Sequence, residues 1–230
     1  MIETLLLRGV HAAEEFGDGR GGGLFPEEEE AIADAVPKRR DEFAAVRRCA
    51  RRALIELGHP PVALVSGPGG APVWPRDVVG SMTHCGGYRA AVVADRRCLP
   101  AIGIDAEPDE SLPGDVLTVV ARPEEIRRFG GTESVRAVNW DRLLFSAKES
   151  VYKAWYPLTQ RWLDFDDVSV TPDPHRRRFS ARVLVAAPAA LRHFRGAWTA
   201  ADGLLLTASV PACAGVDARP GAPASPWSPP

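Results

Sequence analysis

The chain has 230 residues, of which 45% are hydrophobic and 25% are charged, and its formal net charge is −2. These values are typical of a soluble globular protein with one large domain or two small ones. The weak net charge argues against broad binding to nucleic acid or to an anionic membrane, so an anionic ligand would need a local cluster of Arg and Lys.

The sequence gives no sign of a membrane or secreted protein. Residues 1–9 contain only a short apolar run without a signal-peptide pattern, and no later apolar run is long enough to span a bilayer. The protein is therefore expected to be cytoplasmic. Its cysteines are scattered without a C-x-x-C pair, which is typical of buried reduced thiols and not of a disulfide framework or a zinc site. They are Cys49, Cys85, Cys98 and Cys213.

The first quarter of the chain predicts a strand and two helices. Residues 2–10 are expected to form the strand, and a glycine-rich loop at residues 17–23 leads to an acidic helix that begins near Pro26. A longer helix is predicted over residues 41–57, with Gly58 as its end. Its apolar face would consist of Phe43, Val46, Ala50, Ala53, Leu54 and Leu57.

Arginines on this longer helix are the first candidates for binding an anion. At about 100° per residue, Arg47 and Arg51 lie at the border of the apolar face and can line a cleft. Arg48 and Arg52 point to the opposite side, which is expected to be solvated. The Gly/Pro-rich residues 66–75 would allow close approach of the backbone to a flat or phosphorylated ligand, although most such stretches are simple loops.

A hydroxyl-rich segment with one histidine follows. Ser81, Thr83 and His84 precede a run at residues 88–94 that is rich in β-forming residues. His84 lies beside two hydroxyl side chains near a strand edge, where it either binds phosphate or serves as a structural histidine.

Two carboxylates lie two residues apart at the end of a predicted strand. Asp105 and Glu107 follow Ile102 and Ile104, and Pro108 would end the strand. Side chains at i and i+2 project to the same side, where like charges repel one another unless a cation neutralises them. The pair predicts a divalent metal site, and the alternative is an exposed acidic turn over residues 105–110.

The stretch from Trp140 onward predicts a second long helix. Leu144, Ala147, Val151 and Ala154 would form its buried side, and Glu149 and Lys153 lie one turn apart; Pro157 would end the helix at Tyr156. The pair can be an ordinary solvated i,i+4 pair. Two other readings make Ser146 and Glu149 a capping box and Tyr152 and Trp155 core aromatics. If the fold brings Glu149 against Asp105 and Glu107, the three carboxylates would bind Mg²⁺.

The rest of the second half is predicted in outline. Residues 111–140 are less periodic, with a helix start at Pro123 and a break at residues 130–131. Residues 168–170, 178–187 and 203–210 alternate like strands. The composition from residue 211 to the end predicts a disordered tail.

Two motifs resemble those of the 4′-phosphopantetheinyl transferases, specifically the larger type that acts on secondary-metabolism carrier proteins and siderophore synthetases. The first is G-I-D-A-E at residues 103–107, and the second is F-S-A-K-E-S-V-Y-K at residues 145–153. The likeness also includes the W-P-x-x-x-x-G-S-x-T-H-C stretch at residues 74–85, and it covers roughly residues 25–210.

The resemblance implies an α+β fold of two similar halves related by a pseudo-twofold axis. Each half would be a small antiparallel sheet packed on a long helix, and the active site would lie in the cleft between them. The expected division is residues 1–108, residues 109–210 and the tail at residues 211–230, in a monomer.

The resemblance also implies residue roles. Asp105, Glu107 and Glu149 look like the ligands of Mg²⁺, with Mn²⁺ as a possible substitute. The expected contacts to coenzyme A are Arg39, Arg47 and His84 at its 3′-phosphate, Thr83 beside them, Lys148 and Lys153 at phosphate, and the loop Gly70, Ala71 and Pro72 at adenine. Several relatives carry a charged residue where Ala71 stands, and a lysine would be expected where Ser66 stands, so affinity for coenzyme A is expected to suffer somewhat.

The implied reaction transfers the 4′-phosphopantetheine arm of coenzyme A to a serine of an apo acyl or peptidyl carrier protein and releases adenosine 3′,5′-bisphosphate. Asp105, Glu149 and Lys153 would carry the chemistry, with Glu149 taking the serine proton directly or through a metal-bound water. The carrier is expected to dock on residues 112–128. The alternatives are another Mg²⁺-dependent enzyme of nucleotide pyrophosphates and a non-catalytic protein that binds coenzyme A.

Overall fold

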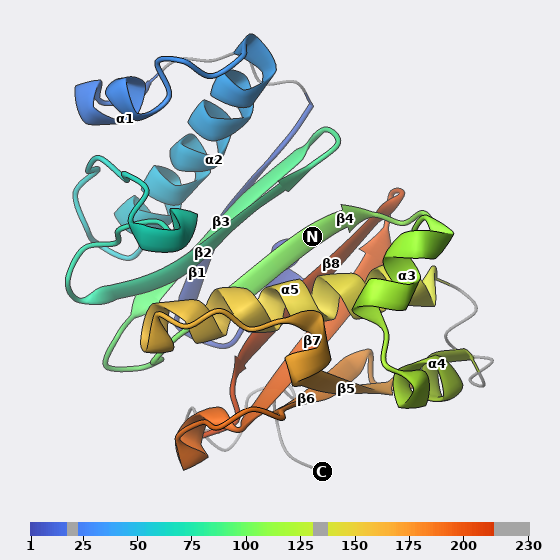
Figure 1. Ribbon diagram of the computed structural model, residues 1–230. Coiled ribbons are helices and arrows are strands. Elements are labelled where there is room, and N and C mark those ends of the chain that lie inside the picture. The colour runs from blue at the N-terminus through green and yellow to red at the C-terminus, as the bar shows by residue number, and fades with distance from the viewer. Residues whose placement is uncertain (18–22, 131–137, 214–230) are drawn as a thin grey trace.

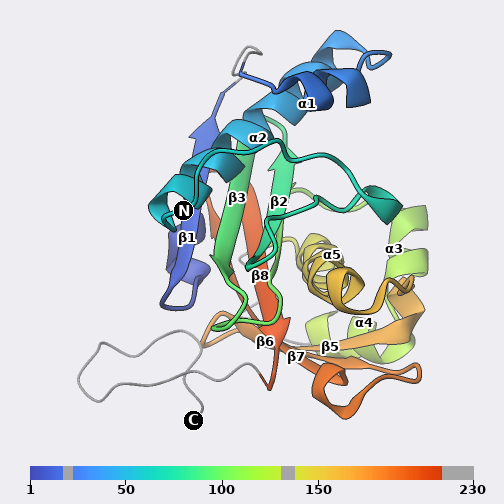
Figure 2. The same cartoon turned by 90° about the vertical axis from the view of Figure 1, so that its left-hand side faces the viewer.

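The structure is a computed structural model that describes residues 1–17, 23–130 and 138–213. Two antiparallel sheets lie side by side, each covered by one long helix (Figures 1 and 2). This mixed arrangement of helices and antiparallel sheets confirms the predicted α+β class. The predicted tail at residues 211–230 lies outside the described residues from position 214 onward.

The first sheet has three strands in the order β1-β3-β2, with β1 at Val10–Phe16, β2 at Val78–Cys85 and β3 at Tyr88–Asp95. The long helix α2, Pro37–Glu56, packs its apolar stripe on one face of this sheet. The predicted face is confirmed for Phe43, Val46, Ala50, Ala53 and Leu54, which are buried. The short helix α1, Pro26–Ala31, begins at Pro26 as predicted, and it lies beside α2.

The second sheet has five strands in the order β4-β8-β7-β6-β5. Their bounds are β4 at Gly103–Pro108, β5 at Val168–Asp173, β6 at Arg178–Val183, β7 at His193–Ala201 and β8 at Leu204–Pro211. The long helix α5, Trp140–Thr159, packs across it, and α3, Gly114–Val120, and α4, Pro123–Gly130, flank α5 (Figure 1). Because β4 pairs with β8, a division of the chain after residue 108 separates this edge strand from the other strands of its sheet.

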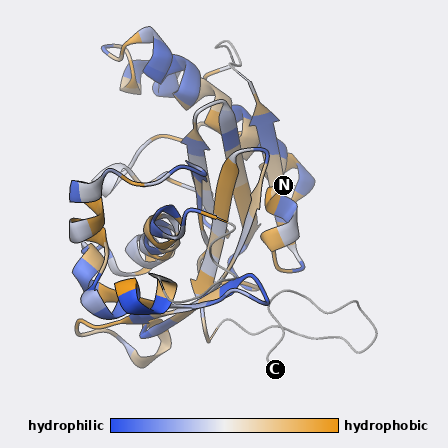
Figure 3. Ribbon diagram, turned by 90° about the vertical axis from the view of Figure 1, so that its right-hand side faces the viewer, coloured by the Kyte–Doolittle hydropathy of each residue, from blue (hydrophilic) through white to orange (hydrophobic). Residues whose placement is uncertain are grey.

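The two sheets meet where β2 and β4 run next to each other. Oγ of Ser81 accepts the backbone N–H of Ile104 at 3.1 Å, and Oγ1 of Thr83 accepts that of Ala106 at 3.0 Å. These hydroxyl groups satisfy amides at the open edge of β4, which would otherwise be buried without a partner. Apolar side chains of both sheets fill the space between them, and Figure 3 shows hydrophobic residues along these central strands.

Helix α5 lies unusually close to the second sheet. A Cβ atom on Gly103 would stand 1.9 Å from the backbone oxygen of Ser150. Only glycine permits this approach, and Oγ of Ser146 bonds to Oγ1 of Thr207 at 2.9 Å in the same interface. This contact excludes the capping-box interpretation of Ser146, which lies in the middle of the helix.

Several sequence expectations about local structure are wrong. Residues 2–10 do not form a strand, because Ile2–Leu5 is a 3₁₀ helix whose apolar side chains are buried, and β1 begins only at Val10. Helix α5 continues through Pro157 to Thr159, since a proline in the last turn removes only one hydrogen bond there. Cys98 and Cys213 are exposed free thiols, whereas Cys49 is buried as expected.

Among the residues that the structure describes, no helix has the length and apolar character needed to cross a membrane.

Candidate active site

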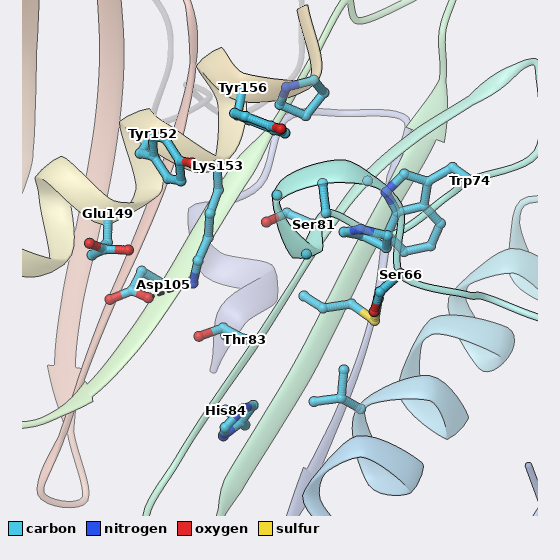
Figure 4. A pocket seen from close by; sticks show the side chains of 18 of the residues that line it. Ser66, Trp74, Ser81, Thr83, His84, Asp105, Glu149, Tyr152, Lys153 and Tyr156 are labelled. Atoms are coloured by element: carbon cyan, nitrogen blue, oxygen red, sulfur yellow. Dashed lines mark hydrogen bonds and ion pairs between the residues drawn. The ribbon is translucent and has the colours of Figure 1, made fainter. Parts of the chain in front are cut away.

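A pocket of about 330 Å³ lies where α2, the connection after it, β2, β4 and α5 come together (Figure 4). It collects most of the predicted site residues from distant parts of the chain. The predicted residues that line it are Arg39, Arg47, Gly70, Ala71, Pro72, Thr83, His84, Asp105, Glu149 and Lys153. Glu107 and Lys148 are predicted site residues that are not part of this lining.

The acidic end of the pocket is formed by β4 and α5. Asp105 is 4% exposed, and Nζ of Lys153 donates to its Oδ1 at 2.7 Å, as the dashed line in Figure 4 shows. Its Oδ2 is buried and has no hydrogen-bond partner among the described residues. Burial and the charge of Asp105 raise the pKa of Glu149 above its usual range, and Lys153 opposes this rise. The two carboxylates therefore repel each other in a poorly hydrated place.

Glu107 lies on the same side of β4 but is held by another residue. Nη1 of Arg142, in the first turn of α5, donates to Oε2 of Glu107 at 2.8 Å. Burial and the charge of Asp105 raise the pKa of Glu107, and Arg142 counteracts both effects. In the described residues, no three His, Cys, Asp or Glu side chains form a ready metal-binding group.

The residues at this end nevertheless fit a divalent cation. Asp105 offers an unsatisfied buried oxygen, and the repulsion between Asp105 and Glu149 would be relieved by positive charge between them. Carboxylate oxygens are the ligands that Mg²⁺ and Mn²⁺ prefer. Asp105 and Glu149 can bind the cation in their present positions. Glu107 would have to give up its hydrogen bond with Arg142 or bind the cation through its other carboxylate oxygen.

The opposite end of the pocket is basic. Nη1 of Arg39 lies 3.1 Å from Nε2 of His84, and burial lowers the pKa of His84. Arg47 stacks on the Phe43 ring, with its guanidinium carbon 3.0 Å from the ring centroid. Burial lowers the pKa of Arg47 to about 10. Two arginines and a histidine at one end of a pocket match the needs of a phosphate group.

The connection between α2 and β2 closes one side of the pocket. Gly69 has a φ of 66°, and a Cβ atom there would stand 2.4 Å from the Tyr156 hydroxyl oxygen, so the backbone needs glycine at this point. Sequence reasoning missed the pocket-lining role of Tyr156 and Trp74 and treated Tyr152 only as a possible core aromatic. The helical spacing of Tyr152 and Tyr156, on the side of Glu149, was the available signal.

Lys148 has a different place from the one implied by the resemblance. The residue is 2% exposed, and its Nζ donates to Oε2 of Glu125 at 2.7 Å and to the carbonyl oxygens of Val120 and Phe165. With three acceptors already bound, this ammonium group joins α3, α4 and α5 on the side away from the pocket lining. Lys148 is therefore not part of the candidate site.

The arginines in the second half of α2 also have different surroundings from one another. Arg47 lines the pocket as predicted, but the guanidinium of Arg51 turns to Glu28 of α1. Arg48 is half-buried beside Glu15, and Arg52 is exposed as expected. Helical periodicity placed both Arg47 and Arg51 at the border of the apolar face, but it gave no information about the buried acid that separates their roles.

Comparisons with known proteins agree with this geometry. Residues 27–94 match the 4′-phosphopantetheinyl transferase N-terminal domain, and residues 101–204 match the 4′-phosphopantetheinyl transferase superfamily. The chain is 51% identical over 203 residues to 4′-phosphopantetheinyl transferase Svp of Streptomyces mobaraensis, covering 86% of this chain and 82% of that protein.

Two further relatives extend the similarity over almost their whole length. 4′-Phosphopantetheinyl transferase Npt of Nocardia iowensis is 47% identical over 90% of this chain and 98% of its own. 4′-Phosphopantetheinyl transferase PptT of Mycobacterium tuberculosis (strain ATCC 25618 / H37Rv) is 45% identical over 86% of this chain and 90% of its own. With both motifs meeting in one pocket and relatives this similar, the chain belongs to the 4′-phosphopantetheinyl transferase superfamily.

Proposed function

We propose that the pocket between α2 and α5 is where this transferase binds coenzyme A and moves its 4′-phosphopantetheine arm to a serine of a carrier protein. One observation carries the proposal: a single pocket has a basic end at Arg39, Arg47 and His84 and an acidic end at Asp105 and Glu149. Coenzyme A carries a 3′-phosphate and a pyrophosphate, so it can place one anionic group at the arginines and the other beside the carboxylates.

The acidic end is proposed to hold a divalent cation, Mg²⁺ or Mn²⁺, through Asp105 and Glu149, with Glu107 as the third ligand. When bound, the cation would neutralise negative charge on the pyrophosphate. This assignment is supported by the unsatisfied Oδ2 of Asp105 and by the raised pKa values of Glu107 and Glu149.

In the proposed reaction, Oγ of the carrier serine forms a bond to the phosphorus of the pantetheine phosphate while the bond to the leaving phosphate oxygen breaks. Adenosine 3′,5′-bisphosphate leaves with the bonding electrons. Lys153 lies at Asp105 within the pocket, where its ammonium group can stabilise charge on the leaving phosphate. A carboxylate oxygen of Glu149 takes the serine proton, directly or through water; because a bound cation would lower the proton affinity of Glu149, the route through water is the easier one.

The proposed architecture is two similar halves with the site between them. It is supported by the two sheets, each with one long helix, and by the pocket lining that comes from both α2 and α5. The carrier is proposed to dock near residues 112–128, where Val119 is 64% exposed and Ile126 is 41% exposed. The carrier's identity, a monomeric state and a cytoplasmic location stay predictions.

Intact mass spectrometry of an apo carrier protein tests the proposal. With coenzyme A and Mg²⁺, the carrier should gain the mass of one phosphopantetheine group, and a chelator should prevent the gain. Glu149→Gln should lower the rate by more than about 100-fold while the fold stays intact, because it removes both a ligand and a base. Glu110→Gln is the matched control on an exposed acid.

Each alternative has its own outcome in this experiment. Full activity of Glu149→Gln would overturn the assigned role of Glu149. Coenzyme A binding without a mass gain on fatty-acid, polyketide and peptide carriers would favour a non-catalytic binding protein. Cleavage of the coenzyme A pyrophosphate without carrier modification would favour a different enzyme of nucleotide pyrophosphates.

A further inference from the structure

A buried carboxylate lies behind the basic end of the pocket. Glu28 belongs to α1, and although Glu27, Glu29 and Glu30 are exposed, the Glu28 side chain is 0% exposed. Burying a carboxylate is costly unless it is paired and hydrogen-bonded. Its position in the fold therefore depends on the groups that surround it.

Glu28 binds three segments of the chain at once. Nη1 of Arg51 in α2 donates to both carboxylate oxygens, at 2.8 and 2.9 Å. The backbone N–H of Phe25 donates to Oε2 at 2.9 Å, and that of Leu64 donates to Oε1 at 2.7 Å. Leu64 lies two residues before Ser66, where the pocket-lining connection begins. One side chain thus joins α1, α2 and the base of that connection.

Arg47 faces the same carboxylate from the pocket side. Its Nε lies 3.9 Å from Oε1 of Glu28 and donates to the carbonyl oxygen of Leu64 at 2.8 Å. Its Nη2 reaches Oγ of Ser66 at 3.4 Å. Glu28 and Arg47 therefore hold Leu64 by its N–H and its C=O respectively. Since Arg39 and Arg51 both disfavour the charge of Arg47, Glu28 is the neighbour that supports it.

We propose that Glu28 is a positioning residue for coenzyme A: it aims the Arg47 guanidinium into the pocket and fixes the start of the connection at residues 66–72. It does so without contacting the substrate. The inference rests on the proposed function, in which Arg47 binds the 3′-phosphate. Without the Glu28 charge, Arg47 and Arg51 would be two buried cations with no anion between them, and the Leu64 amide would lose its acceptor.

Glu28→Gln tests this role, because glutamine keeps the length and one acceptor oxygen but loses the charge. Glu29→Gln, on the exposed side of α1, is the matched control. Dissociation constants for coenzyme A and for 3′-dephospho-coenzyme A are measured by calorimetry, together with kcat and KM. Glu28→Gln should weaken coenzyme A binding about tenfold. Its kcat and its affinity for the dephospho compound should stay close to wild type, as should all values for Glu29→Gln.

The Arg47→Met variant separates failure of the inference from failure of the proposed function. If Arg47→Met binds coenzyme A like wild type, the proposed 3′-phosphate contact is wrong. If Arg47→Met weakens binding but Glu28→Gln does not, the contact stands and the positioning role is wrong. If both weaken binding and the double variant is no weaker than Arg47→Met alone, the two residues act as a unit, as proposed.

Loss of stability is controlled with Glu28→Asp, which keeps the charge on a shorter side chain. Unfolding by urea shows the range of conditions in which each variant is folded, and binding is measured within it. Glu28→Asp should recover most of the coenzyme A affinity that Glu28→Gln loses. Equal losses for the two variants, or equal losses for coenzyme A and its dephospho form, would show a merely structural role and overturn the proposal.

Discussion

Two buried ion pairs, one beside each long helix, are built in the same way. Glu28 of α1 and Glu125 of α4 each occupy the third position of a helix that begins Pro-Glu-Glu. Each carboxylate accepts the backbone N–H of the residue before the proline at 2.9 Å, from Phe25 and Arg122 respectively. Each also accepts an N–H of a segment that follows the long helix, and each pairs with a basic residue 23 positions later.

The two pairs differ in what else they touch. Glu28 pairs with Arg51 and also lies 3.9 Å from the pocket residue Arg47. Among the residues that the structure describes, Glu125 binds Lys148 and two backbone amides, none of which lines the pocket. The same device thus stabilises both parts of the molecule, but only at α2 is it connected to the proposed coenzyme A site.

The largest effect is expected when one acid is removed entirely. Glu125→Ala leaves the Lys148 ammonium buried without a counter-ion and two backbone amides without an acceptor, which should cost about 3–5 kcal/mol of unfolding free energy. Glu28→Ala should cost a similar amount. Urea unfolding of both variants measures this, and a loss below about 1 kcal/mol in either would contradict the common construction.

A smaller but more selective effect is expected when both charges of a pair are removed. Glu125→Gln with Lys148→Met should leave coenzyme A affinity within about twofold of wild type, whereas Glu28→Gln with Arg51→Met should weaken it about tenfold. Calorimetric titration at a temperature where both variants are folded distinguishes them. Weak coenzyme A binding by the first variant would instead support a phosphate contact for Lys148.

The smallest effect is expected at the acids next to the buried ones. Glu27 is exposed, and Glu124 pairs with the partly exposed Arg122, at 2.6 Å. Glu27→Gln should change stability by less than about 0.5 kcal/mol, and Glu124→Gln should also have a small effect because surface ion pairs contribute little. Thermal unfolding checks both variants. A large loss of stability in either variant would mean that the first glutamate of Pro-Glu-Glu, and not the second, stabilises the fold.

The sequence predicted the parts of the site that depend on local spacing. Asp105 at a strand end and Glu149 with Lys153 on one helix face were found from periodicities of two and 3.6 residues, and the fold brings them together. Lys148 lies about 100° around the helix from Glu149, next to the apolar side that Ala147 and Val151 form. That spacing was a signal against a pocket role, although the family resemblance suggested one.

Features that depend on tertiary contacts could not be predicted in the same way. Thr83 was expected beside the coenzyme A contacts, but the sequence did not show that its hydroxyl and that of Ser81 accept backbone amides of β4, a neighbour that is distant in sequence. Strand β7 was missed because its glycine, Gly196, and its polar residues weaken the alternation; a Cβ atom on Gly196 would stand 2.0 Å from the Phe179 ring. The sequence could not distinguish Glu28 from the exposed glutamates beside it, since only the fold shows which one is buried.

The close packing of α5 against Gly103 has a consequence for how the enzyme can move. Asp105 lies two residues after Gly103 on β4, and Glu149 directly precedes Ser150, whose carbonyl packs against Gly103. Because β4 and α5 are in such close contact, they hold both carboxylates as one rigid unit. The pocket arginines, Arg39 and Arg47, lie on α2, which packs on the other sheet. A shift of one sheet against the other would therefore change the span between the phosphate-binding and catalytic groups but not the geometry between the two carboxylates.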